Sequence, residues 1–194
     1  MIPKYINDWL RVIENMKNDN TYKLAWGRAL VECVYFSKFE TYKNKAFIKL
    51  DDLAKCIVKY YWNQVFFFNL RQSPYASKNP AIIQIVNRLI KKFVQINGNS
   101  FPVWFDKAAE KLGDHLDKGI KSVVSILPEN VSWRFKRVDD EMLDLYEYDY
   151  ENRSNVVIFK LSSIKMLKDY SFVISKLLSY KWAQLLEKYP LFNI

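Results

Sequence analysis

Histidine and glycine are scarce in this 194-residue chain, which holds one histidine, four glycines and two cysteines. Zinc sites built from His and Cys, and nucleases that combine a histidine base with histidine or asparagine metal ligands, need more imidazoles than His115 alone supplies. The glycines are isolated, so the chain has no glycine-rich phosphate loop and no Gly-x-Ser-x-Gly turn. We therefore expect no complete metal-dependent or nucleophilic active site and predict no catalytic residue, metal ion or cofactor. His115 lies in a charged helical stretch, where an exposed or salt-linked side chain is expected.

Long apolar runs are absent as well. No stretch approaches the roughly 18 uncharged apolar residues of a transmembrane helix, and the charged beginning of the chain does not resemble a signal peptide. Cys33 and Cys56 stand in apolar helical patterns, so we interpret them as buried free thiols, with a disulfide left open. These features predict a cytoplasmic protein without a membrane partner.

Helical periodicity covers most of the chain. Apolar residues recur three or four positions apart in segments 3–16, 22–36, 51–67, 80–96, 101–112, 114–126 and 162–189. Residues 46–50 form a short alternation that we interpret as an extended lead-in to a helix. Two-residue alternation in 131–136, 143–150 and 156–160 predicts a small antiparallel sheet, with a turn at 151–155.

These patterns predict a mainly α fold of about seven or eight helices with a small antiparallel β-sheet near residues 131–160. We expect a single domain over residues 1–194. Residues 1–127 would be helical, residues 131–160 would form the sheet, and residues 162–189 would form the closing helices.

Charge is distributed unevenly along the chain. Lys and Arg outnumber Asp and Glu by 30 to 21, which gives a formal charge of +9. Residues 1–100 hold 16 cations against 7 acids, and residues 101–194 hold 14 against 14, so the whole excess lies in the first half. A basic field attracts polyanions, nucleic acid first among them. The alternative is compositional, because Lys-rich chains are common where genomes are rich in A and T.

The clearest loop, residues 71–80, and the helix after it carry candidate phosphate ligands. Side-chain donors and the amides at a helix start are typical phosphate contacts in nucleic-acid complexes. The candidates are Arg71, Gln72 and Lys78 in or beside the loop and Arg88, Lys91 and Lys92 on the helix. The alternative is an ordinary solvated helix face that follows a loop.

Two other clusters point less directly to chemistry. The acidic stretch 139–151 could be compared with nuclease metal sites, but the carboxylate required before Lys160 is missing. Alternating acids on a strand are usually its solvated face. The aromatic runs 60–62 and 66–68 are too dense for one buried stripe, so we expect most of them in the core and part on a partner surface.

Several short patches together resemble one protein family. They are TYKLA (21–25), RALVE (28–32), YYWNQ (60–64), NPAIIQIV (79–86), YEY (146–148) and KWAQLLEK (181–188). In this order they resemble the helical N-terminal region of bacterial proteins that carry a C-terminal HNH endonuclease domain, a group that includes restriction-like and defence nucleases. In that family the HNH module follows the last patch, whereas this chain stops at Ile194. No catalytic residue is therefore carried over.

The resemblance implies a fragment, a split subunit or a stand-alone DNA-binding relative. Together with the charge, it predicts a non-catalytic DNA-recognition or accessory domain of an HNH-type restriction-like or defence endonuclease. That domain would bind duplex DNA and act with a nuclease domain or subunit. The alternative is a protein-interaction subunit of a bacterial defence or toxin–antitoxin complex. An unrecognised enzyme is a third reading, and self-association into a homo-oligomer is left open.

Overall fold

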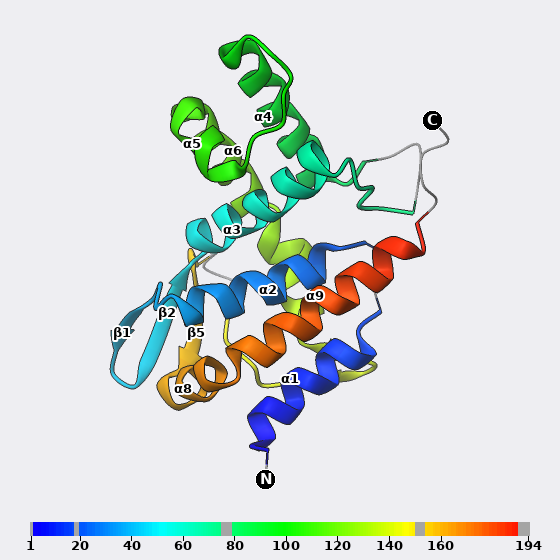
Figure 1. Ribbon diagram of the computed structural model, residues 1–194. Helices are drawn as coiled ribbons and strands as arrows, with labels where there is room; N and C mark the ends of the chain where they lie inside the picture. The colour runs from blue at the N-terminus through cyan, green and yellow to red at the C-terminus, as the bar shows by residue number, and fades with distance from the viewer. Residues whose placement is uncertain (1, 18–19, 75–78, 150–153, 190–194) are drawn as a thin grey trace.

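A computed structural model describes residues 2–17, 20–74, 79–149 and 154–189 (Figure 1). Within these ranges the chain is mainly helical, as predicted. The α-helices are α1 (Lys4–Asn15), α2 (Tyr22–Tyr35), α3 (Leu50–Trp62), α4 (Ala81–Asn97), α5 (Phe105–Leu112), α6 (Asp114–Val124), α7 (Trp133–Phe135), α8 (Leu161–Asp169) and α9 (Ser171–Glu187). Two π-helical turns, η1 (Asn63–Phe67) and η2 (Pro128–Ser132), extend α3 and precede α7. None of the described helices has the length and apolar character needed to cross a bilayer.

The main sheet joins segments that are far apart in the sequence. Its three antiparallel strands are β1 (Glu40–Tyr42), β2 (Lys45–Lys49) and β5 (Val156–Lys160), in the order β1-β2-β5, with Phe47 opposite Ile158. A separate two-stranded hairpin pairs β3 (Arg137–Val138) with β4 (Glu141–Met142). The prediction of a strand at 156–160 is confirmed, and the predicted extended lead-in is β2, the central strand of the sheet.

The predicted strand at 131–136 is wrong, because these residues are helical in η2 and α7. Val131 and Phe135 are buried and four residues apart, a spacing that fits a helix as well as a strand. The Trp133 Nε1–H donates to the carbonyl of Glu129, and the Ser132 hydroxyl donates to that of Pro128, both four residues back. Six residues are too few to separate the two periods.

The predicted strand at 143–150 is also largely wrong in the part that is described, residues 143–149. Its only bridge there joins Glu147 to Ile158 of β5. Leu145 and Tyr146 are adjacent and both buried, so the alternation of inward and outward residues breaks between them. The helix predicted from Phe101 begins at Phe105. A proline disfavours helical backbone at the residue before it, so Pro102 disfavours a helical Phe101.

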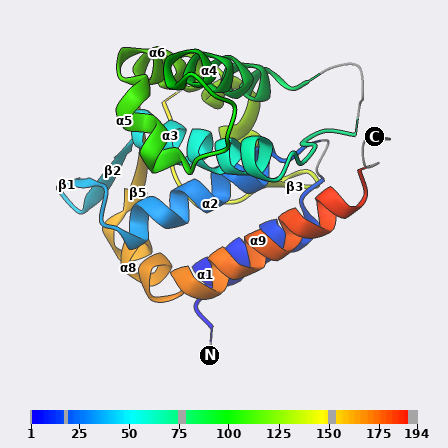
Figure 2. The ribbon, with the colours of Figure 1, turned by 45° about the horizontal axis from the view of Figure 1, so that its top comes forward.

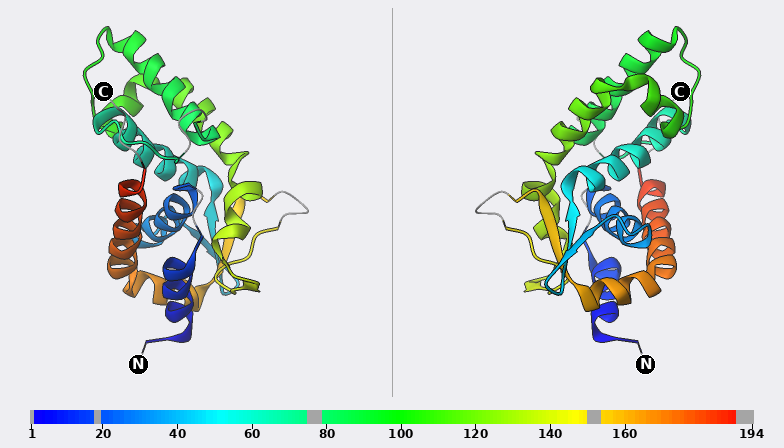
Figure 3. Two further views of the ribbon diagram at one scale, coloured as in Figure 1. Left: turned by 90° about the vertical axis from the view of Figure 1, so that its right-hand side faces the viewer. Right: turned by 90° about the vertical axis from the view of Figure 1, so that its left-hand side faces the viewer.

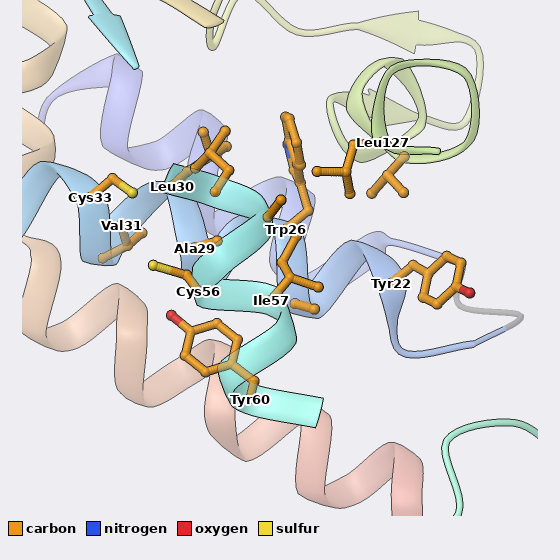
Figure 4. Close-up of a cluster of buried hydrophobic side chains, with 14 of the residues drawn as sticks. Tyr22, Trp26, Ala29, Leu30, Val31, Cys33, Cys56, Ile57, Tyr60 and Leu127 are labelled. Carbon is orange, nitrogen blue, oxygen red and sulfur yellow. The ribbon is translucent and has the colours of Figure 1, made fainter. Parts of the chain in front are cut away.

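Helix α2 forms the centre of the core. It packs between α3 and α9 (Figures 1 and 2). A Cβ atom on Gly27 would lie 2.6 Å from the Phe135 ring, so a glycine is needed where α7 meets α2. Trp26 and Leu30 of α2 meet Ile57 of α3 in one cluster of buried side chains (Figure 4).

Both cysteines are free and buried, which confirms the interpretation from sequence. Cys33 of α2 and Cys56 of α3 point toward each other (Figure 4). The contact with Cys56 raises the pKa of the Cys33 thiol, and burial raises it further. The thiol therefore stays protonated and behaves as a small apolar side chain.

The helices form two groups on either side of α2 and α3. Helices α4, α5 and α6 pack against one another and against α3, while α1, α8 and α9 lie beyond α2 (Figures 1 and 3). Figure 2 shows α4 and α6 side by side on one face. The candidate functional site lies at this pairing of α4 and α6.

Candidate nucleic-acid interface

Helix α4 turns its cations outward because its apolar residues recur with helical spacing. Its buried residues are Ile82, Ile83, Ile85, Val86, Leu89 and Phe93. Arg88 and Lys91 are exposed and Lys92 is half-buried, and the helix contains no Asp or Glu. The helix ends at Asn97 and is capped by Gly98, whose φ of 74° is the left-handed conformation that glycine adopts without strain. Amphipathic spacing alone therefore accounts for the orientation of these three cations.

Gln72 does not belong to this surface, in contrast to the prediction. It is 3% exposed, and its Oε1 accepts hydrogen bonds from Thr21 Oγ1 at 3.1 Å and from Trp182 Nε1 at 3.2 Å. Its Nε2 donates to the carbonyl of Leu70 at 3.3 Å. A buried amide needs such partners, and Gln72 uses them to tie the loop to the start of α2 and to α9. Its role is structural.

The other groups predicted to bind phosphate at the loop and at the start of the helix also contribute less than expected. Arg71 is half-buried, and Lys78 lies outside the described residues. The backbone N–H of Ile82, at the start of α4, donates to the Tyr22 hydroxyl at 2.7 Å and is not available to a phosphate. Burial raises the pKa of the Tyr22 hydroxyl, which keeps it protonated. Of the six predicted residues, Arg88, Lys91 and Lys92 remain together on one helix.

Arg88 and Lys92 line a groove between α4 and α6 that the sequence did not predict. The groove has a volume of about 250 Å³ and is called the α4–α6 groove below. Its α4 side carries Arg88 and Lys92, and its α6 side carries His115, Lys118 and Ser122. Its apolar lining consists of Ile85, Leu89 and Gly119. Lys91 is not among the lining residues, although it neighbours Lys92 in sequence.

A glycine allows the two helices to approach closely at the base of the groove. A Cβ atom on Gly119 would lie 2.9 Å from Cδ1 of Leu89, closer than side-chain atoms normally come. Gly119 is buried and Leu89 is 5% exposed, so neither helix can turn away without loss of packing. The close contact sets the spacing between the cations on α4 and those on α6.

The cations of the groove have no acidic partner in the described part of the chain. No carboxylate there lies within 4.0 Å of Arg88, Lys92 or Lys118. The two acids in the first turn of α6, Asp114 and Asp117, do not line the groove. A concave surface with several unpaired cations concentrates anions.

His115 and Lys118 were missed from the sequence as members of the site. Their spacing of three residues places them on one helix face, as does the spacing of four between Arg88 and Lys92. The signal was therefore present, but only the packing of α6 against α4 brings the two faces together. The Ser122 hydroxyl donates to the carbonyl of Lys118 at 2.9 Å, so its proton is already engaged.

The acidic segment, residues 139–147, shows the opposite arrangement. Each of its five carboxylates forms an ion pair with a cation. The pairs are Arg11–Glu141, Lys17–Asp139, Lys45–Glu147, Arg137–Asp140 and Lys160–Asp144, at 2.6 to 3.6 Å. No three residues of the types His, Cys, Asp and Glu group into a metal site among the residues described. The interpretation of these acids as a solvated face agrees with their exposure.

A buried tyrosine anchors this segment to the core. The Trp26 Nε1–H donates to the Tyr146 hydroxyl at 2.9 Å, and that hydroxyl donates to the carbonyl of Ser132 at 2.5 Å. The Lys136 ammonium donates to the Tyr146 carbonyl at 2.9 Å, and burial lowers the pKa of Lys136. Tyr146 therefore joins α2, η2 and the acidic segment.

A second groove lies between α2 and α9 and has a volume of about 390 Å³. Exposed aromatic side chains of Tyr35, Phe36 and Phe172 line it, with exposed fractions of 56%, 60% and 69%. The Arg28 guanidinium also lines it and lies 4.5 Å from the centre of the Tyr60 ring. Part of the aromatic content is therefore at the surface. The run at 60–62 is buried, as expected for the core, whereas Phe68 of the run at 66–68 is 59% exposed but does not line this groove.

Comparison with protein-family models, with curated proteins and with solved structures finds no match to this chain.

Proposed function

We propose that this chain is a non-catalytic nucleic-acid-binding domain that holds duplex DNA through the α4–α6 groove. In this proposal the domain works in the cytoplasm beside a nuclease domain or subunit, as the resemblance to HNH-type proteins implies. The observation that carries the proposal is the set of three cations, Arg88, Lys92 and Lys118, which line one groove and have no acidic partner among the described residues. Lys91, exposed on the same helix, would add a contact outside the groove.

Phosphate groups are the ligands that such a site suits best. Lys and Arg contacts to backbone phosphates supply most of the affinity in nonspecific DNA binding and position the protein in specific complexes. The two groove-lining helix faces present guanidinium and ammonium groups from opposite sides, which can contact one strand at neighbouring phosphates. Unpaired like charges held close together destabilise a free protein slightly, and a bound polyanion removes that cost.

The test is the salt dependence of binding. A labelled duplex of about 20 base pairs is titrated with the chain at several salt concentrations, and fluorescence anisotropy gives the dissociation constant. Three neutralised phosphates predict a slope of log affinity against log salt of about −2.7 or steeper. In the triple variant Arg88→Gln/Lys92→Gln/Lys118→Gln, the slope should be shallower by about that amount. Weak binding with a flat slope, or an unchanged slope in the variant, would reject the proposal.

The α2–α9 groove favours a second candidate function, that of a protein-interaction module. Phe172 and Tyr35 leave more than half of their surface exposed beside a hollow of about 390 Å³. Aromatic side chains are enriched at protein–protein interfaces. A partner chain or a second copy would bury these rings.

Sedimentation of the purified chain tests this second candidate. Self-association that is lost in Phe172→Asp and retained in the triple glutamine variant would assign the main role to the α2–α9 groove. A monomer that binds DNA as described above would instead support the first proposal.

A further inference from the structure

The α4–α6 groove is concave and small, which limits what can enter it. Its volume of about 250 Å³ lies below the range of about 300–1,000 Å³ that holds drug-sized ligands. A single phosphate group fits within this volume. The backbone of duplex DNA is convex and is contacted at the mouth of the groove. A phosphate at the end of a strand projects from the duplex and can enter the α4–α6 groove.

The charge in the groove exceeds what one internal phosphate requires. Arg88, Lys92 and Lys118 carry three positive charges, and His115 adds an imidazole N–H donor. An internal phosphodiester has one negative charge and two free oxygens. A terminal phosphate monoester has about 1.5 to 2 negative charges near pH 7 and three free oxygens. Cations on two sides of one hollow can contact all three of those oxygens, and the greater charge offsets more of the repulsion among the cations.

The apolar lining restricts the polar contacts of the groove to its two sides. Ile85 and Leu89 offer no hydrogen-bond donor, so every contact comes from the two rims, Arg88 and Lys92 on one side and His115 and Lys118 on the other. A tetrahedral group with several oxygens can reach both rims at once.

We propose that the α4–α6 groove is a pocket for the terminal phosphate monoester of a nucleic-acid strand. This inference rests on the proposed function and adds to it a preference for phosphorylated strand ends. The natural ligand would then be a DNA end that carries a phosphate, the kind of end that hydrolytic cleavage of a phosphodiester produces.

The experiment compares one short duplex in three forms, with a 5′-phosphate, with a 3′-phosphate and with hydroxyl ends, at fixed salt. We expect at least one phosphorylated form to bind about tenfold more tightly than the hydroxyl form. Lys92→Gln and Lys118→Gln should each remove most of this gain. Lys91→Gln is the matched control, because Lys91 is exposed on the same helix but does not line the groove, and it should retain the gain.

The outcomes separate this inference from the proposed function. Equal affinity for all three duplexes, still lost in the Arg88, Lys92 and Lys118 variant, would overturn the end preference and leave DNA binding intact. No binding of any duplex would overturn both. Titration with inorganic phosphate alone tests a free-phosphate source. If inorganic phosphate binds with a dissociation constant as low as that of the phosphorylated duplex, the groove would be assigned to free phosphate and the nucleic-acid assignment would be overturned.

Discussion

The α4–α6 groove, with three cations, and the acidic segment, with five carboxylates, differ in whether their charged side chains are paired. In the acidic segment all five carboxylates pair with cations from α1, the α1–α2 connection and the strands β2, β3 and β5. In the groove, Arg88, Lys92 and Lys118 have no carboxylate within reach among the described residues. Charge that is paired contributes to the fold, and charge that is unpaired is available to a ligand.

This comparison changes the meaning of the charge distribution along the chain. The excess of positive charge lies in residues 1–100. Four of those cations, Arg11, Lys17, Lys45 and Lys59, pair with acids of the second half, while Lys118 of the second half lines the groove. The division at residue 100 is therefore not a division in space. The gathering of unpaired cations in one groove, not the net charge of a segment, therefore distinguishes the candidate surface.

The largest expected effect is on DNA binding, and it tests the comparison directly. The double variant Arg88→Glu/Lys118→Glu changes two groove cations, and Arg11→Glu/Lys45→Glu changes two partners of the acidic segment. Each lowers the formal charge from +9 to +5, two units per replaced cation. A lost charged contact to phosphate costs about tenfold in affinity, so the groove variant should bind duplex DNA about 100-fold more weakly.

The second variant should change affinity less than about threefold, because its cations already face carboxylates. Circular dichroism should establish that both variants fold, and anisotropy should then give the two affinities at one salt concentration. Equal losses in the two variants would mean that net charge alone drives binding, and the distinction between paired and unpaired cations would fail.

The next effect is on stability and belongs to the acidic segment. Tyr146→Phe removes the hydroxyl that bonds to the Trp26 indole and to the Ser132 carbonyl. Both partners stay buried and lose a hydrogen bond, so the free energy of unfolding should fall by about 1–3 kcal/mol. Urea unfolding measures it. Tyr180→Phe, on an exposed tyrosine of α9, is the control and should change stability little. If the two variants are equally stable, Tyr146 does not anchor the segment.

Much of the fold could be predicted from the sequence because helices bury local, periodic stripes. The stripe of α4 and the cations opposite it follow from 17 residues without reference to any other part of the chain. Strand pairing is different, since β2 and β5 are more than a hundred residues apart and their alternation is short. The segment 131–136 fits both periods, and in the structure it is helical and contacts α2.

The candidate site was half predictable for the same reason. Arg88 and Lys92 could be found because one helix presents both of them. His115 and Lys118 could not, since they join the site only when α6 packs on α4 through Gly119. Gln72 was assigned to the surface because polar loop residues usually lie there, yet its amide bonds to Trp182, 110 residues away. Long-range contacts decide such cases.

The smallest expected effect is on the free energy of unfolding, and it has opposite signs in the two regions. Neutralising Lys45, which pairs with Glu147 at 3.0 Å, should lower the free energy of unfolding by about 0.2–1 kcal/mol, because an exposed ion pair is lost. Neutralising Lys92 should raise it by about 0.2–0.5 kcal/mol, because Arg88 lies one turn away and the two like charges repel. Urea unfolding of Lys45→Gln and Lys92→Gln at low salt measures both differences, and high salt should shrink them. If Lys92→Gln also destabilised the chain, Lys92 would be contributing favourable contacts to the free protein. The groove cations would then be part of the scaffold, as the cations of the acidic segment are.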